Sequence, residues 1–286
     1  MPLYELENER SFDRPVLVVC LEGWIDAGVG AAAALAALLT SRSTDRIAVF
    51  DNDILLDHRS RRPIMRVVDG MNAGLTWPAT ELRAGTDDAG NDLLFLIGPE
   101  PDLRWRAFTA DAVDLARRLG VRLAVGLGAF PAPVPHTRPV RLVTTSVVAD
   151  LVHQFGYLPG TIDVPAGIHA SLELGFGEAG IPALGLWARV PHYVSAMPYP
   201  AASAALIDGL VRVAGLQLES RDLHESAERT RTRIDDLIAN SEEHRQLVAQ
   251  LEAQADAESP HPGQPIPSGD EIAAELERFL RGEGGG

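Results

Sequence analysis

Short apolar runs alternate with amphipathic stretches along the first 216 residues. The runs are bounded by Gly, Pro or Asp, which is typical of strands buried on both faces. They cover residues 16–21, 47–50, 93–97, 123–127 and 183–188. The stretches that separate most of them are rich in Ala and Leu or carry apolar residues three and four positions apart, which predicts helices. These cover residues 28–41, 103–119, 147–155, 167–179 and 201–214. Strand–helix repetition predicts an α/β fold, with a mainly parallel sheet covered by helices on both faces.

Residues 51–91 interrupt this rhythm. Strand-like patterns recur at 65–68 and 76–77, with polar and glycine residues between them. We expect an antiparallel hairpin at an edge of the sheet.

The character of the chain changes after residue 216. Residues 217–257 carry an apolar stripe among charged residues, which predicts one long or two consecutive amphipathic helices, with a break where Asn240 and Glu243 resemble a capping box. Four prolines make 258–267 an extended linker. Ser268 and Glu271 form a second capping box, so 268–286 is expected to be a terminal helix with a glycine-rich tail. We expect this extension to dock on a neighbouring subunit or a partner, and packing against its own subunit is the alternative.

Composition limits the function classes. The chain has 286 residues, of which 46% are hydrophobic, so it can bury a large core. Its formal net charge of -15 argues against nucleic acid as a partner. The first ten residues are acidic where a secretory signal needs positive charge, and the longest apolar stretch, 28–39, is too short to span a bilayer. We therefore expect a cytoplasmic protein without a membrane partner.

Two features of composition bear on chemistry. All 25 basic residues are arginine, so Schiff-base chemistry, a phosphate-loop lysine and a lysine base are excluded. Cys20 is the single cysteine and lies in an apolar run, which favours a buried thiol over a reactive one.

Four loops follow predicted strands at their carboxyl ends. They cover residues 22–28, 98–105, 131–139 and 191–200. Parallel strands place these ends along one edge of a sheet, which is where open α/β sheets bind ligands. The sequence therefore predicts one shared surface, with His136 and His192 at the same edge.

The first loop is rich in glycine and opens a helix, a geometry that can hold an anion on backbone amides. Asp26 is either a catalytic carboxylate or the N-cap of that helix. Glu22 ends a buried strand directly, so it is either a functional carboxylate or a partner for an arginine.

His136 and Arg138 alternate in an extended segment between prolines, so both can face one pocket. The alternative is that they brace the loop by hydrogen bonds to neighbouring carbonyls. His192 and Tyr193 offer the same choice. None of the histidines has the spacing of a zinc site, so no metal is predicted.

Five short motifs in this order resemble the PAC2 family, named for a proteasome assembly chaperone, in its actinobacterial form. They are Gly-Trp-Ile-Asp-Ala-Gly at 23–28, Arg-Pro at 62–63, Gly-Pro-Glu-Pro at 98–101 with Trp105, Pro-His-Thr-Arg-Pro at 135–139 and Pro-His-Tyr at 191–193. The likeness covers roughly residues 3–216 and implies a PAC2-like α/β domain over residues 1–216. It implies a three-layer α/β/α sandwich similar to nucleoside phosphorylases and hydrolases, usually a homo-oligomer such as a trimer, in a family with members that help proteasome rings to assemble.

The end of the chain departs from that family. Some members dock on the ring through a carboxyl-terminal hydrophobic-Tyr-X motif, whereas this chain ends in glycines. Docking by the terminus is therefore not expected, although another face can still bind proteasome subunits or another protein client.

Two classes of function remain open. The first is a non-enzymatic assembly chaperone or interaction module. The second is an enzyme or binding protein for a small anionic or nucleoside-like ligand, in which the 23–28 loop holds the anion, Arg138 or Arg62 neutralises charge and His136 or His192 moves a proton. An ATP-grasp ligase is disfavoured because lysine is absent.

No catalytic residue and no cofactor is assigned from the sequence. The candidate ligand-binding or partner-binding residues are Glu22, Gly23, Trp24, Asp26, Gly28, Arg62, Glu100, Trp105, His136, Arg138, His192 and Tyr193.

Overall fold

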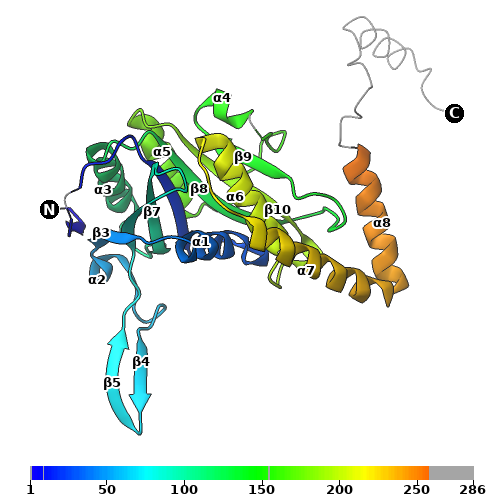
Figure 1. Cartoon of the computed structure of the whole chain (residues 1–286), viewed down its shortest axis with the longest axis horizontal. Coiled ribbons are helices and arrows are strands. Elements are labelled where there is room, and N and C mark those ends of the chain that lie inside the picture. The colour runs from blue at the N-terminus through cyan, green and yellow to red at the C-terminus, as the bar shows by residue number, and fades with distance from the viewer. Residues whose placement is uncertain (1, 9, 154, 258–286) are drawn as a thin grey trace, which may run out of the picture.

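An eight-stranded sheet forms the centre of the protein (Figure 1). The computed structural model describes residues 2–8, 10–153 and 155–257. Four parallel strands occupy the middle of the sheet, in the order β7, β2, β8, β10. They span Asp92–Pro99 (β7), Val16–Glu22 (β2), Leu123–Ala132 (β8) and Ala183–Pro191 (β10). The predicted parallel strands are therefore confirmed at the centre of the sheet.

Antiparallel strands complete the sheet on both sides. Beyond β7 lie β6 (Glu81–Thr86), β3 (Asp45–Phe50) and β1 (Tyr4–Leu6), and beyond β10 lies β9 (Leu142–Ser146). The run at 47–50 was expected in the parallel part. It forms β3 instead, whose two neighbours in the sheet are β1 and β6, and it pairs antiparallel with both.

Helices cover both faces, as predicted for a three-layer α/β/α sandwich. The helices α3 (Trp105–Arg118) and α5 (Ile168–Glu178) lie on one face, and α1 (Gly30–Thr40) and α6 (Pro200–Ala214) lie on the other. Alternate residues of β2 supply both cores. Leu17 and Val19 pack on the α3 and α5 side, whereas Val16 and Val18 pack on the α1 and α6 side, because side chains alternate along a strand.

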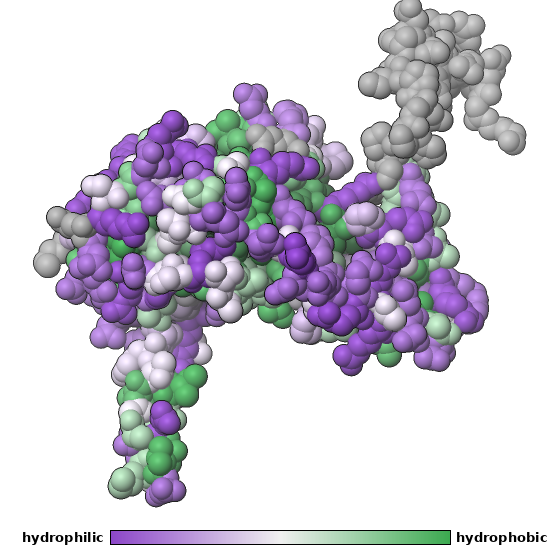
Figure 2. All heavy atoms as spheres, viewed as in Figure 1, coloured by the Kyte–Doolittle hydropathy of each residue, from purple (hydrophilic) through white to green (hydrophobic). Residues whose placement is uncertain are grey.

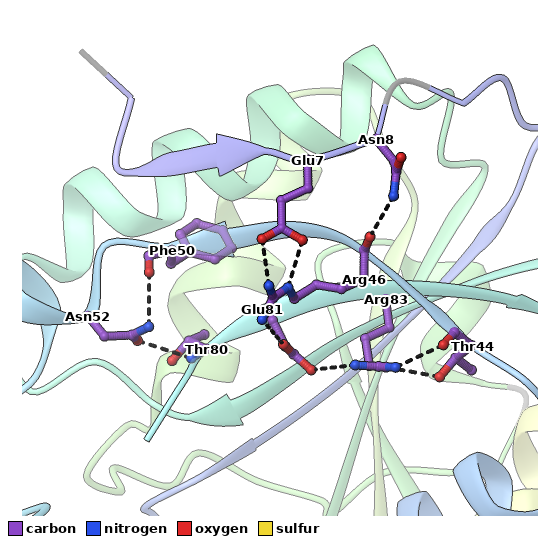
Figure 3. A network of polar contacts seen from close by, with 9 residues as sticks. All are labelled: Glu7, Asn8, Thr44, Arg46, Phe50, Asn52, Thr80, Glu81 and Arg83. Carbon is purple, nitrogen blue, oxygen red and sulfur yellow. Dashed lines mark hydrogen bonds and ion pairs between the residues drawn. The ribbon is translucent and has the colours of Figure 1, made fainter. Parts of the chain in front are cut away.

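A polar network fixes the antiparallel side of the sheet (Figure 3). Arg46 on β3 donates from Nε and Nη2 to the two carboxylate oxygens of Glu7, both at 2.7 Å. Arg83 on β6 donates to Oε1 of Glu81 and to the carbonyl oxygen of Thr44, at 2.9 and 2.8 Å. The bonds of Arg83 satisfy the charged side chains of β6, a strand that also buries Leu82 and Ala84.

The predicted hairpin exists, but it does not extend the main sheet. β4 (Ile64–Val68) and β5 (Met71–Thr76) pair only with each other as a separate two-stranded sheet. This arm projects from the body beyond the short helix α2 (Asn52–Leu55) (Figure 1). A second difference lies at 147–155, where the helix is limited to α4 (Ala149–Val152).

Two helices form the described part of the C-terminal extension. They are α7 (Arg221–Ala239) and α8 (Glu242–Ala257), and they confirm the predicted break. The capping residue of α8 is Ser241 and not Asn240, because Oγ of Ser241 accepts a hydrogen bond from the amide of His244. Ile234 of α7 is buried in the same core as α6, so α7 packs within its own subunit. The predicted linker and terminal helix at 258–286 lie outside the described residues.

Candidate functional site

The loops at the carboxyl ends of β2, β7, β8 and β10 lie against one another along one edge of the sheet. The amide of Glu100 donates to the carbonyl oxygen of Glu22 at 2.7 Å, which joins the first two loops. The amide of Gly28 donates to the carbonyl oxygen of Ser195 at 2.8 Å, which joins the first loop to the last. The predicted shared edge is therefore present.

Both loop histidines lie at this edge, as expected. The amide of His136 donates to the hydroxyl of Tyr193 at 2.8 Å, and Nδ1 of His192 lies 3.4 Å from the carbonyl oxygen of Ala132. Tyr193 belongs to the short helical turn η2 (His192–Val194), which directly follows β10. The ring of His192 itself is exposed.

Asp26 caps the helix that follows the first loop. Its Oδ1 accepts from the amide of Ala31 at 2.7 Å and its Oδ2 accepts from Ala32 at 2.9 Å, across the turn η1 (Ala27–Val29). Burial raises the pKa of the carboxyl above its ordinary value, although these bonds act in the opposite direction. Two amides of the first turn of α1 are thus already bonded to a carboxylate of the same chain, and within the 23–28 loop the amide of Gly28 is bonded to Ser195.

Gly23 and Gly28 are required by the shape of this loop. Both adopt positive φ, at 146° and 65°. A Cβ atom at Gly23 would lie 2.6 Å from Cγ of Glu100, and one at Gly28 would lie 2.7 Å from Cβ of Tyr199. The two glycines therefore let neighbouring loops approach closely.

A cavity of about 120 Å³ lies beneath the first loop. Glu22, Gly23, Trp24, Asp26 and Glu100 line it, so five predicted residues do come together. Glu100 also accepts the amide of Ile168 at 3.0 Å and so caps α5. The cavity is smaller than the roughly 300 Å³ at which small-molecule sites begin.

His169 completes the wall of this cavity and was not singled out from the sequence. It lies on α5, half-buried, and its Nε2 accepts the amide of Leu21 at 3.2 Å. Burial lowers its pKa to about 4, so the ring is neutral at pH 7. Burial, followed by the charges of Asp26 and Glu22, raises the pKa of the Cys20 thiol to about 12. The predicted burial of the thiol is confirmed.

His136 and Arg138 do not share a pocket, because both bond to the C-terminal helices. The side chain of His136 is 1% exposed, with Nδ1 2.7 Å from the hydroxyl of Tyr193 and Nε2 3.0 Å from Oδ1 of Asp235 on α7. An ionised carboxylate can only accept, so Nε2–H donates to Asp235; in the neutral ring Nδ1 then accepts the hydroxyl proton of Tyr193. Burial raises the pKa of Tyr193 to about 12.

Arg138 makes a two-pronged contact with α8. Its Nε and Nη2 donate to the two carboxylate oxygens of Asp256, both at 2.8 Å, and its Nη1 donates to Glu252 at 3.2 Å. Thr137 also donates to Glu252. The predicted bracing role is correct in kind, but the partners are acidic side chains of α7 and α8 and not neighbouring carbonyls.

The remaining predicted residues lie apart from both groups. Arg62 is exposed at the base of the β4–β5 arm. The indole nitrogen of Trp105 donates to the carbonyl oxygen of Pro101, at the start of α3. Glu22 is exposed at the mouth of the cavity, and among the described residues no arginine forms an ion pair with it.

Within the described ranges, no group of three or more His, Cys, Asp or Glu side chains could hold a metal ion. In the same ranges, no helix has both the length and the apolar character needed to cross a bilayer.

The protein is a three-layer α/β/α sandwich in which the loop after β8 is hydrogen-bonded to the C-terminal helices α7 and α8. The sequence profile of the PAC2 family matches residues 20–238, which is more than half of the chain. The chain therefore belongs to the PAC2 family.

Solved structures agree with this assignment. A protein of unknown function from Corynebacterium glutamicum is 33% identical, with a TM-score of 0.83 and coverage of 90% of this chain and 97% of that chain. A proteasome-assembly chaperone homologue from Mycobacterium tuberculosis, Rv2125, is 34% identical, with a TM-score of 0.76 and coverage of 82% and 99%. A search of curated proteins finds no match.

Proposed function

We propose that this protein is a non-enzymatic assembly chaperone that binds proteasome subunits through the strand-end edge of its sheet. The observation that carries the proposal is its likeness to the proteasome-assembly chaperone homologue of M. tuberculosis, which extends over 82% of this chain and 99% of that one at 34% identity.

The contacts of the candidate catalytic groups support a role without catalysis. His136 and Arg138 are bonded to acidic side chains of α7 and α8, and Asp26 is bonded to the amides of α1. A general acid or base must instead reach a substrate proton. The cavity beneath the first loop is also too small for a nucleoside, and the groove of about 780 Å³ beside it has a mainly apolar lining.

The edge also carries the apolar surface that a protein client needs. Trp24 is 49% exposed, and Ile25 and Val29 beside it are also exposed. Leu103 is exposed on the adjacent loop that follows β7. Apolar groups on neighbouring loops, with charged residues around them, are typical of protein-binding surfaces.

Co-expression with the α and β proteasome subunits of the same organism tests the proposal. Native mass spectrometry should detect a complex with unassembled subunits and faster formation of rings. Val29→Asp combined with Leu103→Asp should abolish the complex, whereas Leu237→Asp, at an equally exposed apolar position on α7, should retain it. The proposal fails if wild-type protein forms no complex and leaves ring formation unchanged, or if nucleosides raise its melting temperature.

A further inference from the structure

The β4–β5 arm exposes apolar side chains that contact nothing else in the subunit. Every residue of both strands is exposed, and Ile64 and Met71 are each 72% exposed. Figure 2 shows these hydrophobic residues gathered on the arm. An isolated two-stranded hairpin is at best marginally stable in water, so the arm needs a partner surface.

A large apolar groove lies elsewhere on the same subunit. It has a volume of about 780 Å³, between the segment 157–167, the helix α5 and the ends of β9 and β10. Its exposed apolar lining comprises Trp24, Ile25, Tyr157, Leu158, Ile162, Val164 and Leu174. Exposed apolar surface of this kind marks a binding site.

The arm cannot reach the groove of its own subunit. It extends from the region of α2 away from the body, on the side opposite to α4 and β9 (Figure 1). Any contact between the two surfaces is therefore made between different subunits.

The two surfaces are complementary in charge as well as in polarity. The arm and its base, residues 57–77, contain four arginines and two aspartates, although the whole chain carries a net charge of -15. The groove lining contains Asp163 and Glu173 and no arginine. Opposite charge at facing surfaces favours association and disfavours other pairings.

We propose that the β4–β5 arm of one copy of this chain docks in the 157–174 groove of a second copy. Such a contact is heterologous, because it joins two different surfaces, and it generates a ring when the rotation between copies closes. The proposal concerns self-assembly, and a docked arm would cover Trp24 and Ile25 of the groove but not Val29 or Leu103 of the proposed client surface.

Cysteine cross-linking tests the pairing directly. Cys20 is buried, so introduced cysteines supply the accessible thiols. Met71→Cys on the arm and Leu174→Cys in the groove are prepared as separate proteins, mixed, and treated with a short bis-maleimide. We expect a cross-linked dimer on a denaturing gel from the mixture, and none from either protein alone, since each carries only one of the two facing positions.

Leu237→Cys provides the matched control, because Leu237 is 56% exposed, as Leu174 is, but lies on α7. A mixture of Met71→Cys with Leu237→Cys should give no dimer. The proposal is overturned if the Met71→Cys and Leu174→Cys mixture fails to cross-link, if Met71→Cys cross-links alone, which would place two arms together, or if the control links equally well.

Light scattering provides a second readout that needs no thiol. The wild-type protein should have a mass that is a multiple of 30.7 kDa. Met71→Asp should reduce it to the mass of one chain, and Leu237→Asp should not. A monomeric wild type would refute self-docking and leave the proteasome-binding proposal to its own test.

Discussion

The buried side chain of His136 joins the body of the protein to α7, and replacing it tests what holds the C-terminal helices. In His136→Phe the ring volume is kept, but the bonds from Nδ1 to Tyr193 and from Nε2 to Asp235 are lost. A neutral hydrogen bond contributes about 1 kcal/mol. Asp235 is half exposed, so its bond also contributes only about 1 kcal/mol. Only the second of these bonds joins the body to α7, since Tyr193 also belongs to the body, so the docking of α7 should weaken by about 1 kcal/mol, which raises the undocked population about fivefold.

Hydrogen exchange read by mass spectrometry measures this population along α7. Exchange should accelerate in residues 229–239, which surround Asp235. It should change little in 221–227, because Leu223 near the start of α7 packs against the core that α6 helps to form. Exchange in the sheet should not change, since local opening leaves the core intact.

His224→Phe is the matched control. It also removes a contact between a histidine and an aspartate, but both side chains are about half exposed, so the contact should contribute little. If His136→Phe leaves exchange in 229–239 unchanged, or if His224→Phe accelerates it equally, burial of His136 is not what strengthens the contact, and the reasoning fails.

Three further predictions concern the core. Gly98→Ala should destabilise the protein by more than about 3 kcal/mol in urea unfolding, because φ is 110° and a Cβ atom would lie 2.1 Å from the carbonyl oxygen of Ala79. The pKa of His169 is lowered to about 4, so between about pH 6.5 and pH 4 the unfolded state binds a proton that the folded state does not. The free energy of unfolding should therefore fall by about 3 kcal/mol as the pH is lowered through that range. His169→Gln should remove this pH-dependent loss of stability. Cys20 should react with a thiol reagent at pH 8 only after unfolding, since its pKa is raised to about 12.

The central sheet could be predicted from the sequence because its strands are buried on both faces. Such strands appear as continuous apolar runs, and Gly120 ends the preceding helix clearly. The antiparallel strands at the sides gave weaker signals. β6 alternates Glu81 and Arg83 with Leu82 and Ala84, and β9 is a five-residue strand rich in threonine. Pairing with neighbours distant in sequence, and not local propensity, determines both strands.

The sequence could not predict that the candidate residues fall into two separate groups, one around the cavity beneath the first loop and one bonded to α7 and α8. His136 and Arg138 follow β8 as expected, but their partners lie 99 and 118 positions later on α7 and α8. Acidic residues are frequent in that segment, so no spacing distinguishes Asp235 or Asp256 from exposed neighbours. His169 was missed for a related reason, because only the packing of α5 against the end of β2 encloses it.

The contacts of the C-terminal helices determine which part of the edge remains available. Asp235, Glu252 and Asp256 supply carboxylates to the basic side chains of the loop after β8, where an anionic ligand would otherwise bind. Such a ligand would have to displace carboxylates that are covalently linked to the same chain and so present at high effective concentration. A protein client meets no such competition at Val29 and Leu103, which remain exposed. The same contacts that disfavour a small anionic ligand therefore leave the apolar half of the edge open for a protein.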